Sequence, residues 1–416
     1  MPLSHVLVMA LPLAVGLGLA GLAGRRGWAP TLAVTLCVGV GLRLAVLLIA
    51  AQDSWQPYDL ANDFRDTADY VLDGRDPLLA LLEVRGREGG GWHFLPFLAY
   101  VLAGERELGL LLGIPWEVAA RLGPVLADLA LIPLVGKLAT EHRELRRFQY
   151  ACAPLALMIS CIHGQFVPIT LLLGVLALLA ARRQRGWPAG LFIGLSVTAT
   201  TWSVLLLPGV LMSLRGLRGR LIVLGLTGVI PLAFLLSGPL VLDTPVDRLP
   251  DSVKTIISAR PVVGDWGWTA LVTGGAQEVS PFLSRIGSLV LLAGVIAACW
   301  WWRRADPLDL TIAVLLVFIV VTYRFGAQYL VWALPLLIAR PTRGAWPAIV
   351  VASVWAGYGY LYLTRLSALA WGDARVEWAL SSWIVIATLI WALPWQRRRG
   401  VPEPDTIPAV RHAAPT

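Results

Sequence analysis

The sequence predicts an all-α, polytopic membrane protein with about 11 to 13 transmembrane spans and one amphipathic helix at the membrane interface. Three observations carry this prediction. Of the 416 residues, 57% are hydrophobic and 14% are charged, whereas a soluble domain usually has about 25% charged residues. Apolar runs of roughly 20 residues, the length that crosses a bilayer, recur from end to end. Short arginine clusters separate these runs.

The expected spans follow the apolar runs in order. They lie at residues 5–23, 30–51, 117–138, 148–163, 166–182, 187–214, 221–241, 284–302, 308–323, 327–339, 345–364 and 379–395. Segment 187–214 has arginines at both ends, so we expect a hairpin of two short helices that turns near Thr200 to Ser203. Residues 1–399 then form one membrane domain, and we expect the Pro- and Ala-rich tail 400–416 to be disordered.

The arginines set the expected orientation in the membrane. The net charge of +8 comes almost entirely from arginine, and its position at span ends is the positive-inside pattern, which makes nucleic-acid binding a poor interpretation. The extracytoplasmic side then holds three long connections, at residues 52–116, 242–283 and 365–378. The clusters expected on the cytoplasmic side are at residues 25–26, 143–147, 182–185, 215–220, 303–304, 340–343 and 397–399.

The first outer connection contains the most informative segment, Tyr58 to Asp76. A helix with about 3.6 residues per turn would have an apolar face there and an acidic face. We expect the apolar face to lie on the membrane surface and the carboxylates to face substrates that collect there, although a merely solvated acidic face is the alternative. The apolar face would hold Leu60, Phe64, Thr67, Ala68, Val71 and Leu72, and the acidic face Asp59, Asn62, Asp63, Asp66, Tyr70 and Asp73.

Other polar residues on the expected outer side are candidates for the same site. His93 and His163 are able to act as a base or as phosphate ligands. Arg324 lies on the outer side against the positive-inside trend, which favours a role in binding phosphate. Trp266 is either an interfacial anchor or a stacking surface for a sugar.

One carboxylate, Asp128, lies inside an expected span. A charge in the bilayer is costly and is usually paired. Arg121 shares its helix face but is two turns away, so we expect Asp128 to pair with another helix. The four cysteines also lie in apolar runs and show no metal-binding spacing.

These groups meet the requirements for moving a sugar from a lipid phosphate to a hydroxyl. The acceptor hydroxyl needs a carboxylate or an imidazole to take its proton. A carboxylate also stabilises an oxocarbenium-like transition state, and the leaving phosphate needs cations or hydrogen-bond donors. No cofactor or metal is required, although clustered carboxylates are able to bind a divalent cation.

Four groups of residues resemble the GT-C superfamily of polytopic glycosyltransferases, which use polyprenyl-phosphate sugars. The likeness is to the polyprenyl-phosphomannose-dependent mannosyltransferases of GPI-anchor assembly and of actinobacteria, and it covers most of the chain. The stretches are 66–77 with 93–100, 127–129, 163–166 with 189–196 and 207–208, and 328–335.

The resemblance implies that the catalytic aspartate is Asp59 or Asp63. Many relatives carry an Asp-x-Asp motif at this place, whereas the flanks of Asp59 here are Tyr58 and Leu60, so both candidates stay open. Asp66 would orient the acceptor or the base.

The resemblance also implies a binding site for the phosphate and the sugar. Relatives often have a lysine where this chain has Thr200-Thr201-Trp202, so the phosphate contact would come from other residues. The expected binding residues are His93, His163, Gln165, Arg324, Gln328 and Trp266.

The resemblance therefore implies an inverting hexosyltransferase in the cell membrane, with its active site on the extracytoplasmic side. The partners would be a polyprenyl-phosphate sugar, with mannose as the expected sugar, a lipid-linked or glycan acceptor, and membrane lipids. One alternative is a lipid-linked-sugar transporter or flippase, although such proteins tend to show inverted repeats and sites near the midplane. Another is a non-catalytic assembly partner of a transferase.

Overall fold

The computed structural model describes residues 3–53, 55–85, 92, 94–257, 262–365 and 368–397. The regular structure in these ranges is almost entirely helical, which confirms the all-α prediction. Its strands form one antiparallel ribbon, β1 (Val262–Val263) with β2 (Glu278–Val279), in which Val262 faces Val279. His93 and the tail 400–416 lie outside the described residues, so the predictions for them stay untested.

Within the described residues, six helices are long and apolar enough to cross a membrane. They are α1 (Leu3–Arg26), α2 (Leu32–Ala51), α6 (Trp116–Leu138), α12 (Leu217–Leu235), α16 (Pro281–Trp301) and α20 (Ala368–Trp391). Shorter apolar elements accompany them: α8 (Pro154–Leu157) with η2 (Met158–His163), α9 (Val167–Arg182), α10 (Gly186–Ala199), η3 (Thr201–Leu206) with α11 (Leu207–Ser213), α17 (Pro307–Val321), η5 (Ala327–Val331) with α18 (Leu334–Ala339), and α19 (Ala345–Gly357) with η6 (Tyr358–Tyr362). This set is compatible with a multi-pass membrane protein.

The remaining elements are short or lie in the expected connections. They are η1 (Asp59–Asp63), α3 (Phe64–Leu72), α4 (Pro77–Arg85), α5 (Pro96–Leu112), α7 (Arg143–Ala151), α13 (Gly238–Val241), η4 (Val246–Arg248), α14 (Leu249–Ile257), α15 (Gly267–Val272), η7 (Leu363–Arg365) and η8 (Trp395–Arg397). The expected third connection, 365–378, is largely helix because α20 already begins at Ala368. The charged residues that indicated a loop, Arg375 and Glu377, lie along the first half of that helix.

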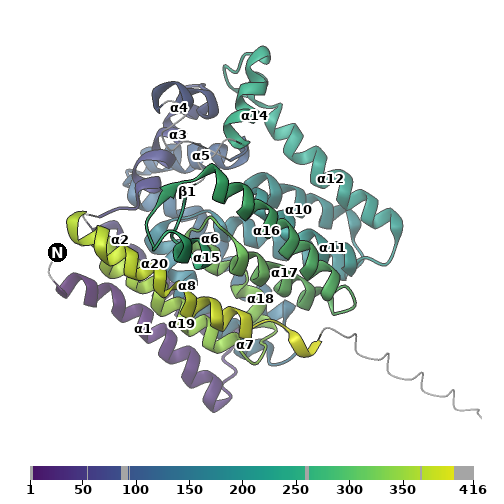
Figure 1. Ribbon diagram of the computed structural model, residues 1–416. Coiled ribbons are helices and arrows are strands. Elements are labelled where there is room, and N and C mark those ends of the chain that lie inside the picture. The colour runs from purple at the N-terminus through teal and green to yellow at the C-terminus, as the bar shows by residue number, and fades with distance from the viewer. Residues whose placement is uncertain are drawn as a thin grey trace, which may run out of the picture.

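The connections gather at two ends of the helical bundle, with α3, α4 and α14 together at the top of Figure 1. At that end, the first and second expected outer connections meet, since Thr244 donates to Asp76 at 2.8 Å and Arg248 to Glu83 at 2.7 Å. Arginines of two of the predicted clusters lie at the other end, near α7 in the lower part of Figure 1, where Arg147 donates to the Pro30 carbonyl and Arg182 to the Leu138 carbonyl. The two predicted sets of connections are therefore separated along the bundle.

The segment 187–214 is the predicted hairpin. α10 ends at Ala199, and Thr200 is extended (φ −149°, ψ 126°) before the chain returns through η3 and α11. Gln184 ties the two ends together, because its amide donates to the Ser213 carbonyl at 2.8 Å and accepts from the Arg215 N–H at 2.9 Å. Glycines at every fourth position of α10 allow close approach of α12, as small residues do between membrane helices.

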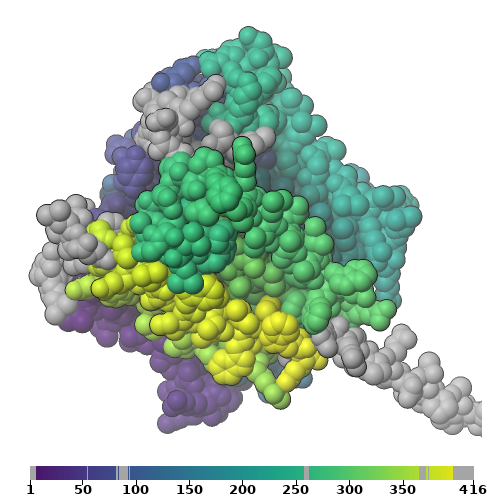
Figure 2. Space-filling model, in the orientation of Figure 1, coloured from purple at the N-terminus to yellow at the C-terminus, as the bar shows by residue number. Residues whose placement is uncertain are grey.

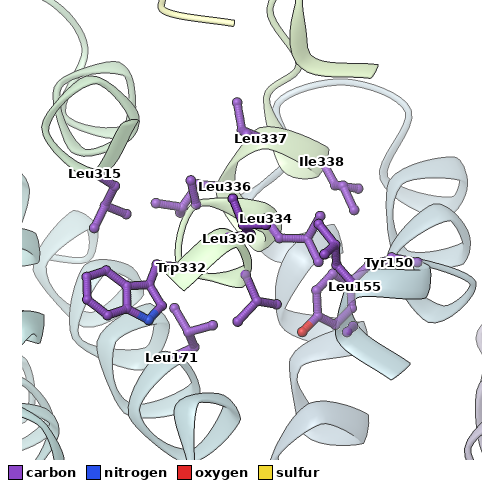
Figure 3. Close-up of a cluster of buried hydrophobic side chains, with 14 of the residues drawn as sticks. Tyr150, Leu155, Leu171, Leu315, Leu330, Trp332, Leu334, Leu336, Leu337 and Ile338 are labelled. Carbon is purple, nitrogen blue, oxygen red and sulfur yellow. The ribbon is translucent and has the colours of Figure 1, made fainter. Parts of the chain in front are cut away.

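The core surrounds α18, whose apolar side chains are all buried. Figure 3 shows Leu334, Leu336, Leu337 and Ile338 of this helix together with Trp332. Around them lie Leu315 of α17, Leu171 of α9, Leu155 of α8 and Tyr150 of α7. The centre of the bundle is therefore filled by helices that are too short to cross a membrane alone.

A sealed ion-pair network joins α2, α6, α7 and η2. Arg43 lies 2.8 Å from Asp128, and their side chains are 0% and 1% exposed. Two hydroxyl groups donate to Asp128, that of Tyr150 at 2.6 Å and that of Ser160 at 3.0 Å. Arg43 also donates to the Ala151 carbonyl at 2.9 Å. The prediction that Asp128 pairs with another helix is confirmed, and the partner is Arg43 on α2.

Candidate functional site

Three π-helical turns converge at the end of the molecule where the first outer connection lies. Each contributes one polar side chain: Asp59 from η1, His163 from η2 and Tyr360 from η6. The Nε2 atom of His163 is 3.0 Å from the Asp59 carboxylate, and its Nδ1 atom is 2.6 Å from the Tyr360 hydroxyl. Because π turns are rare and often mark functional sites, their meeting here identifies the candidate site.

The Asp59 carboxylate is held by three donors and is still accessible. They are His163 Nε2, the side-chain amide of Gln165, and the backbone N–H of Leu60 at 3.0 Å. A carboxylate has about four lone-pair directions, so roughly one remains for a further donor. The Asp59 side chain is 28% exposed, which gives an incoming hydroxyl access to that direction.

The charge state of this group follows from its partners. Burial alone would raise the pKa of Asp59, but the charge and hydrogen bond of His163, with the Leu60 N–H, outweigh burial and place the pKa below its ordinary value. The ionised carboxylate can only accept, so His163 must carry hydrogen on Nε2. The Nδ1 atom of His163 is 2.6 Å from the Tyr360 hydroxyl: a neutral ring accepts a hydrogen bond there, and a charged ring, the form whose charge lowers the pKa of Asp59, donates one.

This pairing changes the role expected for His163. The sequence predicts His163 as a phosphate ligand, but both of its ring nitrogens have protein partners, Asp59 and Tyr360. His163 is therefore placed to orient the carboxylate and is not placed to bind the phosphate.

Gly164 gives the local backbone the shape that this arrangement needs. Its φ of +72° is in the left-handed region that favours glycine, and it turns the chain between His163 and Gln165. A Cβ atom at Gly164 would lie 2.9 Å from both Arg121 Cγ and Leu60 Cδ1. The turn thus brings two polar side chains to Asp59 while packing closely against α6 and η1.

Arg121 is a fully buried cation next to Asp59 and His163 in the sequence segments that it contacts. Its guanidinium donates to Gln56 Oε1 at 2.8 Å and to the Ile162 carbonyl at 2.7 Å, and it also contacts the Glu117 carbonyl. These contacts join the start of the first outer connection to α6 and to the end of η2. Arg121 therefore holds in place the two segments that carry Asp59 and His163.

The predicted amphipathic helix exists, but its apolar face covers protein. Leu60, Phe64, Thr67 and Ala68, four residues of the predicted apolar face, are buried inside the protein. The ring centroid of Phe64 is 4.3 Å from that of Phe166, and the same cluster includes side chains of α5. The prediction that this face lies on the membrane surface is wrong, because α5 and the Phe166 region already cover it. Leu72 is also exposed, at 42%.

The predicted acidic face also changes at its first residue. The helical pattern placed Asp59 above Asp63 and Asp66 on one α-helical surface. Because η1 is a π turn, closed by i→i+5 hydrogen bonds, that alignment does not hold, and Asp59 reaches His163. Asp63 ends η1, and Asp66 lies in the first turn of α3, both half-buried.

Trp266 is a core residue. It is 0% exposed, its ring is stacked 3.9 Å from that of Phe325, and its Nε1 donates to the Ile319 carbonyl at 2.7 Å. An interfacial anchor or a sugar-stacking surface needs an accessible ring face, so burial argues against both predicted roles.

Arg324 and Gln328 lie on the segment between α17 and α18. The guanidinium of Arg324 is 5.4 Å from the ring centroid of Tyr323, and its carbonyl accepts from Thr322 at 2.8 Å. Gln328 belongs to η5 and is half-buried. Their predicted substrate-binding roles stay predictions.

Sequence reasoning missed two residues of the site. Tyr360 lies 197 residues from His163, and nothing near it in the sequence points to a partner so distant. Arg121 was considered only beside Asp128, on the same helix. Its three oxygen partners come from η2, from α6 itself and from the start of the first outer connection.

No group of three or more His, Cys, Asp or Glu side chains that could hold a metal ion occurs among the described residues. Neither protein-family models nor curated proteins match the chain. Function must therefore be inferred from the residues and geometry of this chain.

Proposed function

We propose that the protein is a membrane glycosyltransferase of the GT-C type, which moves a hexose from a polyprenyl phosphate to a hydroxyl group. Asp59 takes the acceptor proton, and the acceptor oxygen forms a bond to C1 of the sugar. The bond from C1 to the phosphate oxygen breaks, and the phosphate leaves with the bonding electrons. Attack from the face opposite the phosphate inverts the configuration at C1.

The observation that carries this proposal is the oriented, accessible carboxylate of Asp59. His163, Gln165 and Leu60 fix its position, and about one lone-pair direction remains for an acceptor hydroxyl. A positioned general base contributes about 10²- to 10⁴-fold to a rate. These contacts favour Asp59 over Asp63 as the base.

The other roles extend from this centre. Asp66 orients the acceptor, and Arg324 is the proposed cation for the leaving phosphate, together with His93. The site lies at the end of the bundle opposite the arginines near α7. Because the positive-inside pattern favours a cytoplasmic position for arginine clusters, we propose that the site is extracytoplasmic. Mannose is the proposed sugar, and the acceptor is a lipid-linked or glycan hydroxyl.

The test is transfer of radiolabelled mannose from a synthetic polyprenyl-phosphate donor by the purified, full-length protein, with membrane glycolipids as acceptors. We expect Asp59→Asn to lower transfer by about 10²- to 10⁴-fold and Asp63→Asn to keep most of it. Both variants are checked for folding by size-exclusion chromatography and thermal unfolding. Full activity of a folded Asp59→Asn protein would refute the assignment of the base.

A lipid-linked-sugar transporter is the second candidate, because a transporter would share the apolar helices and the polar residues gathered around Asp59 at one end of the bundle. Translocation of a fluorescent lipid-linked sugar across proteoliposomes, measured without any acceptor, separates the two functions. Translocation without transfer would favour the transporter.

A further inference from the structure

A cavity of about 650 Å³ lies at the arginine-rich end of the bundle, far from Asp59. α1, α7 and α19 enclose it, and these helices lie in the lower part of Figure 1. Figure 2 shows α1, in purple, along the same edge of the molecule as the yellow C-terminal helix. The residues that matter for its chemistry are Gly21, Gly24, Arg25, His142, Arg146 and Trp346.

A second cavity, of about 510 Å³, adjoins the first. The two share Arg146 and Trp346, which form the wall between them. The second adds Arg343 and the tryptophans Trp391 and Trp395. Together these two neighbouring cavities, called the recess below, have arginines and large aromatic rings in their walls.

Glycines on α1 leave the first cavity open. A Cβ atom at Gly21 would meet no other atom within 4 Å, and one at Gly24 would meet only the Gln149 side chain, at 3.1 Å. Larger residues at these positions would extend into the recess. The size of the cavity therefore depends on the small residues of this helix face.

The recess is positively charged. Arg25, Arg146 and Arg343 contribute to its walls, whereas the acidic residue among them, Glu144, is 3.8 Å from Arg147. The guanidinium of Arg146 donates to the Gln149 side chain at 2.9 Å, and its other N–H groups are available to a ligand in the recess. Arginines recognise phosphate groups through charge-assisted hydrogen bonds.

The recess also has the polarity expected at the boundary of a bilayer. It lies where α1 ends and α7 begins, next to a helix, α19, that is apolar throughout. Trp346, Trp391 and Trp395 are the kind of residue that occupies the headgroup level, with an apolar ring and one polar N–H. A ligand here would need a negative head and an apolar tail.

We propose that these two cavities bind an anionic phospholipid of the leaflet on the arginine-rich side. Arg25, Arg146 and Arg343 contact the headgroup phosphate, and Trp346 packs against the glycerol and the first methylenes of the acyl chains. Basic pockets between membrane helices are known to hold anionic headgroups in this way. The lipid would fasten α1 to α7 and α19.

The test is native mass spectrometry of the full-length protein released from nanodiscs of phosphatidylglycerol and phosphatidylcholine. We expect the wild-type protein to retain phosphatidylglycerol selectively. Gly21→Leu fills the first cavity without removing charge, and Arg146→Gln removes the shared cation. Arg146→Gln should lower retention about tenfold or more, as expected for the loss of a charge-assisted contact. Gly21→Leu should also lower retention, because its side chain occupies the space that the lipid needs.

Two matched controls should keep the lipid. Gly18→Leu adds the same side chain to α1 at a position where a Cβ atom also meets nothing within 4 Å but which does not line the first cavity. Arg304→Gln removes an exposed arginine outside both cavities. Equal retention in all variants would overturn the proposal. Displacement of the lipid by equimolar glycerol phosphate would also overturn it, because the site would then bind soluble phosphates. If Gly21→Leu does not fold, Arg146→Gln still decides.

Discussion

The carboxylates of Asp128 and Asp59 both contact side chains of the same short segment, η2, yet their surroundings differ. Ser160 of η2 donates to Asp128, and His163, three residues later, contacts Asp59. Asp128 is sealed with Arg43, and both side chains are at most 1% exposed. Asp59 and His163 are 28% and 13% exposed.

The difference shows how one structure can make one carboxylate structural and another reactive. Asp128 faces a full cation and two hydroxyl groups, so its charge is balanced and no approach is open. Asp59 faces an imidazole, an amide and one backbone N–H, and about one accepting direction remains. The first network holds η2 rigidly, and this rigidity places His163 beside Asp59.

The largest expected effect is on stability at the sealed network. Asp128→Asn leaves the Arg43 guanidinium buried without its counter-charge, which should cost about 3–5 kcal/mol of unfolding free energy. Denaturant unfolding of the purified protein in detergent measures this loss. The double variant Arg43→Met/Asp128→Leu should recover most of it, because no uncompensated charge remains. A cost below about 1 kcal/mol for Asp128→Asn would mean that the pair is not sealed.

The same substitution at the other carboxylate should have the opposite pattern. Asp59→Asn should lower transfer by about 10²- to 10⁴-fold, since an amide cannot take the acceptor proton. Its unfolding free energy should fall by only about 1–2 kcal/mol, because the remaining oxygen still accepts hydrogen bonds. Rates and unfolding are measured on the same preparations. Similar stability losses for Asp59→Asn and Asp128→Asn would remove the distinction between the two sites.

The sequence predicted the parts of this comparison that depend on local pattern. Apolar length placed a span at 117–138, and the helix found is Trp116–Leu138. The cost of a charge in a span predicted a partner for Asp128 on another helix, although the residue itself, Arg43, could not be chosen. Helical periodicity predicted burial of Leu60 and Phe64.

The parts that failed depend on non-local packing. Periodicity assumes an α-helix, and the π turn at η1 moves Asp59 off the predicted acidic face. Tyr360 reaches His163 only because α19 packs beside α8 and η6 packs beside α1, which no short motif reveals. Trp266 looked interfacial because tryptophan favours that region, but Phe325 and Trp355 bury it.

A smaller effect tests how the reactive site is oriented. Tyr360→Phe removes the hydroxyl that contacts His163 Nδ1, and the loss of one hydrogen bond of about 0.5–1.5 kcal/mol should lower kcat by roughly 2- to 13-fold. KM should stay unchanged, because Tyr360 acts on the carboxylate through His163. Tyr362→Phe, in the same π turn and 41% exposed, is the matched control. A change in KM alone would place Tyr360 in substrate binding.

The last test concerns a third carboxyl group, Glu105 on α5. It extends the comparison because the described hydrogen bond of Glu105 is with a backbone N–H. Burial raises the pKa of Glu105 to about 8, although the Gly123 N–H, at 2.7 Å from the carboxyl, opposes the shift. The folded protein thus keeps a proton that the unfolded chain, with an ordinary pKa of 4.5, releases earlier. Stability should therefore be greatest below about pH 4.5, fall as pH rises and level off above about pH 8.

Thermal unfolding between about pH 5 and 9 measures this dependence. Glu105→Gln should reduce the slope, because the amide has the shape of the protonated carboxyl and does not titrate. Glu107→Gln, at an exposed position of the same helix, should leave the slope unchanged. If the stability of Glu105→Gln changes with pH as steeply as that of the wild-type protein, the Glu105 carboxyl does not cause the pH dependence. Glu105 would then be ionised in the folded protein, as Asp59 is.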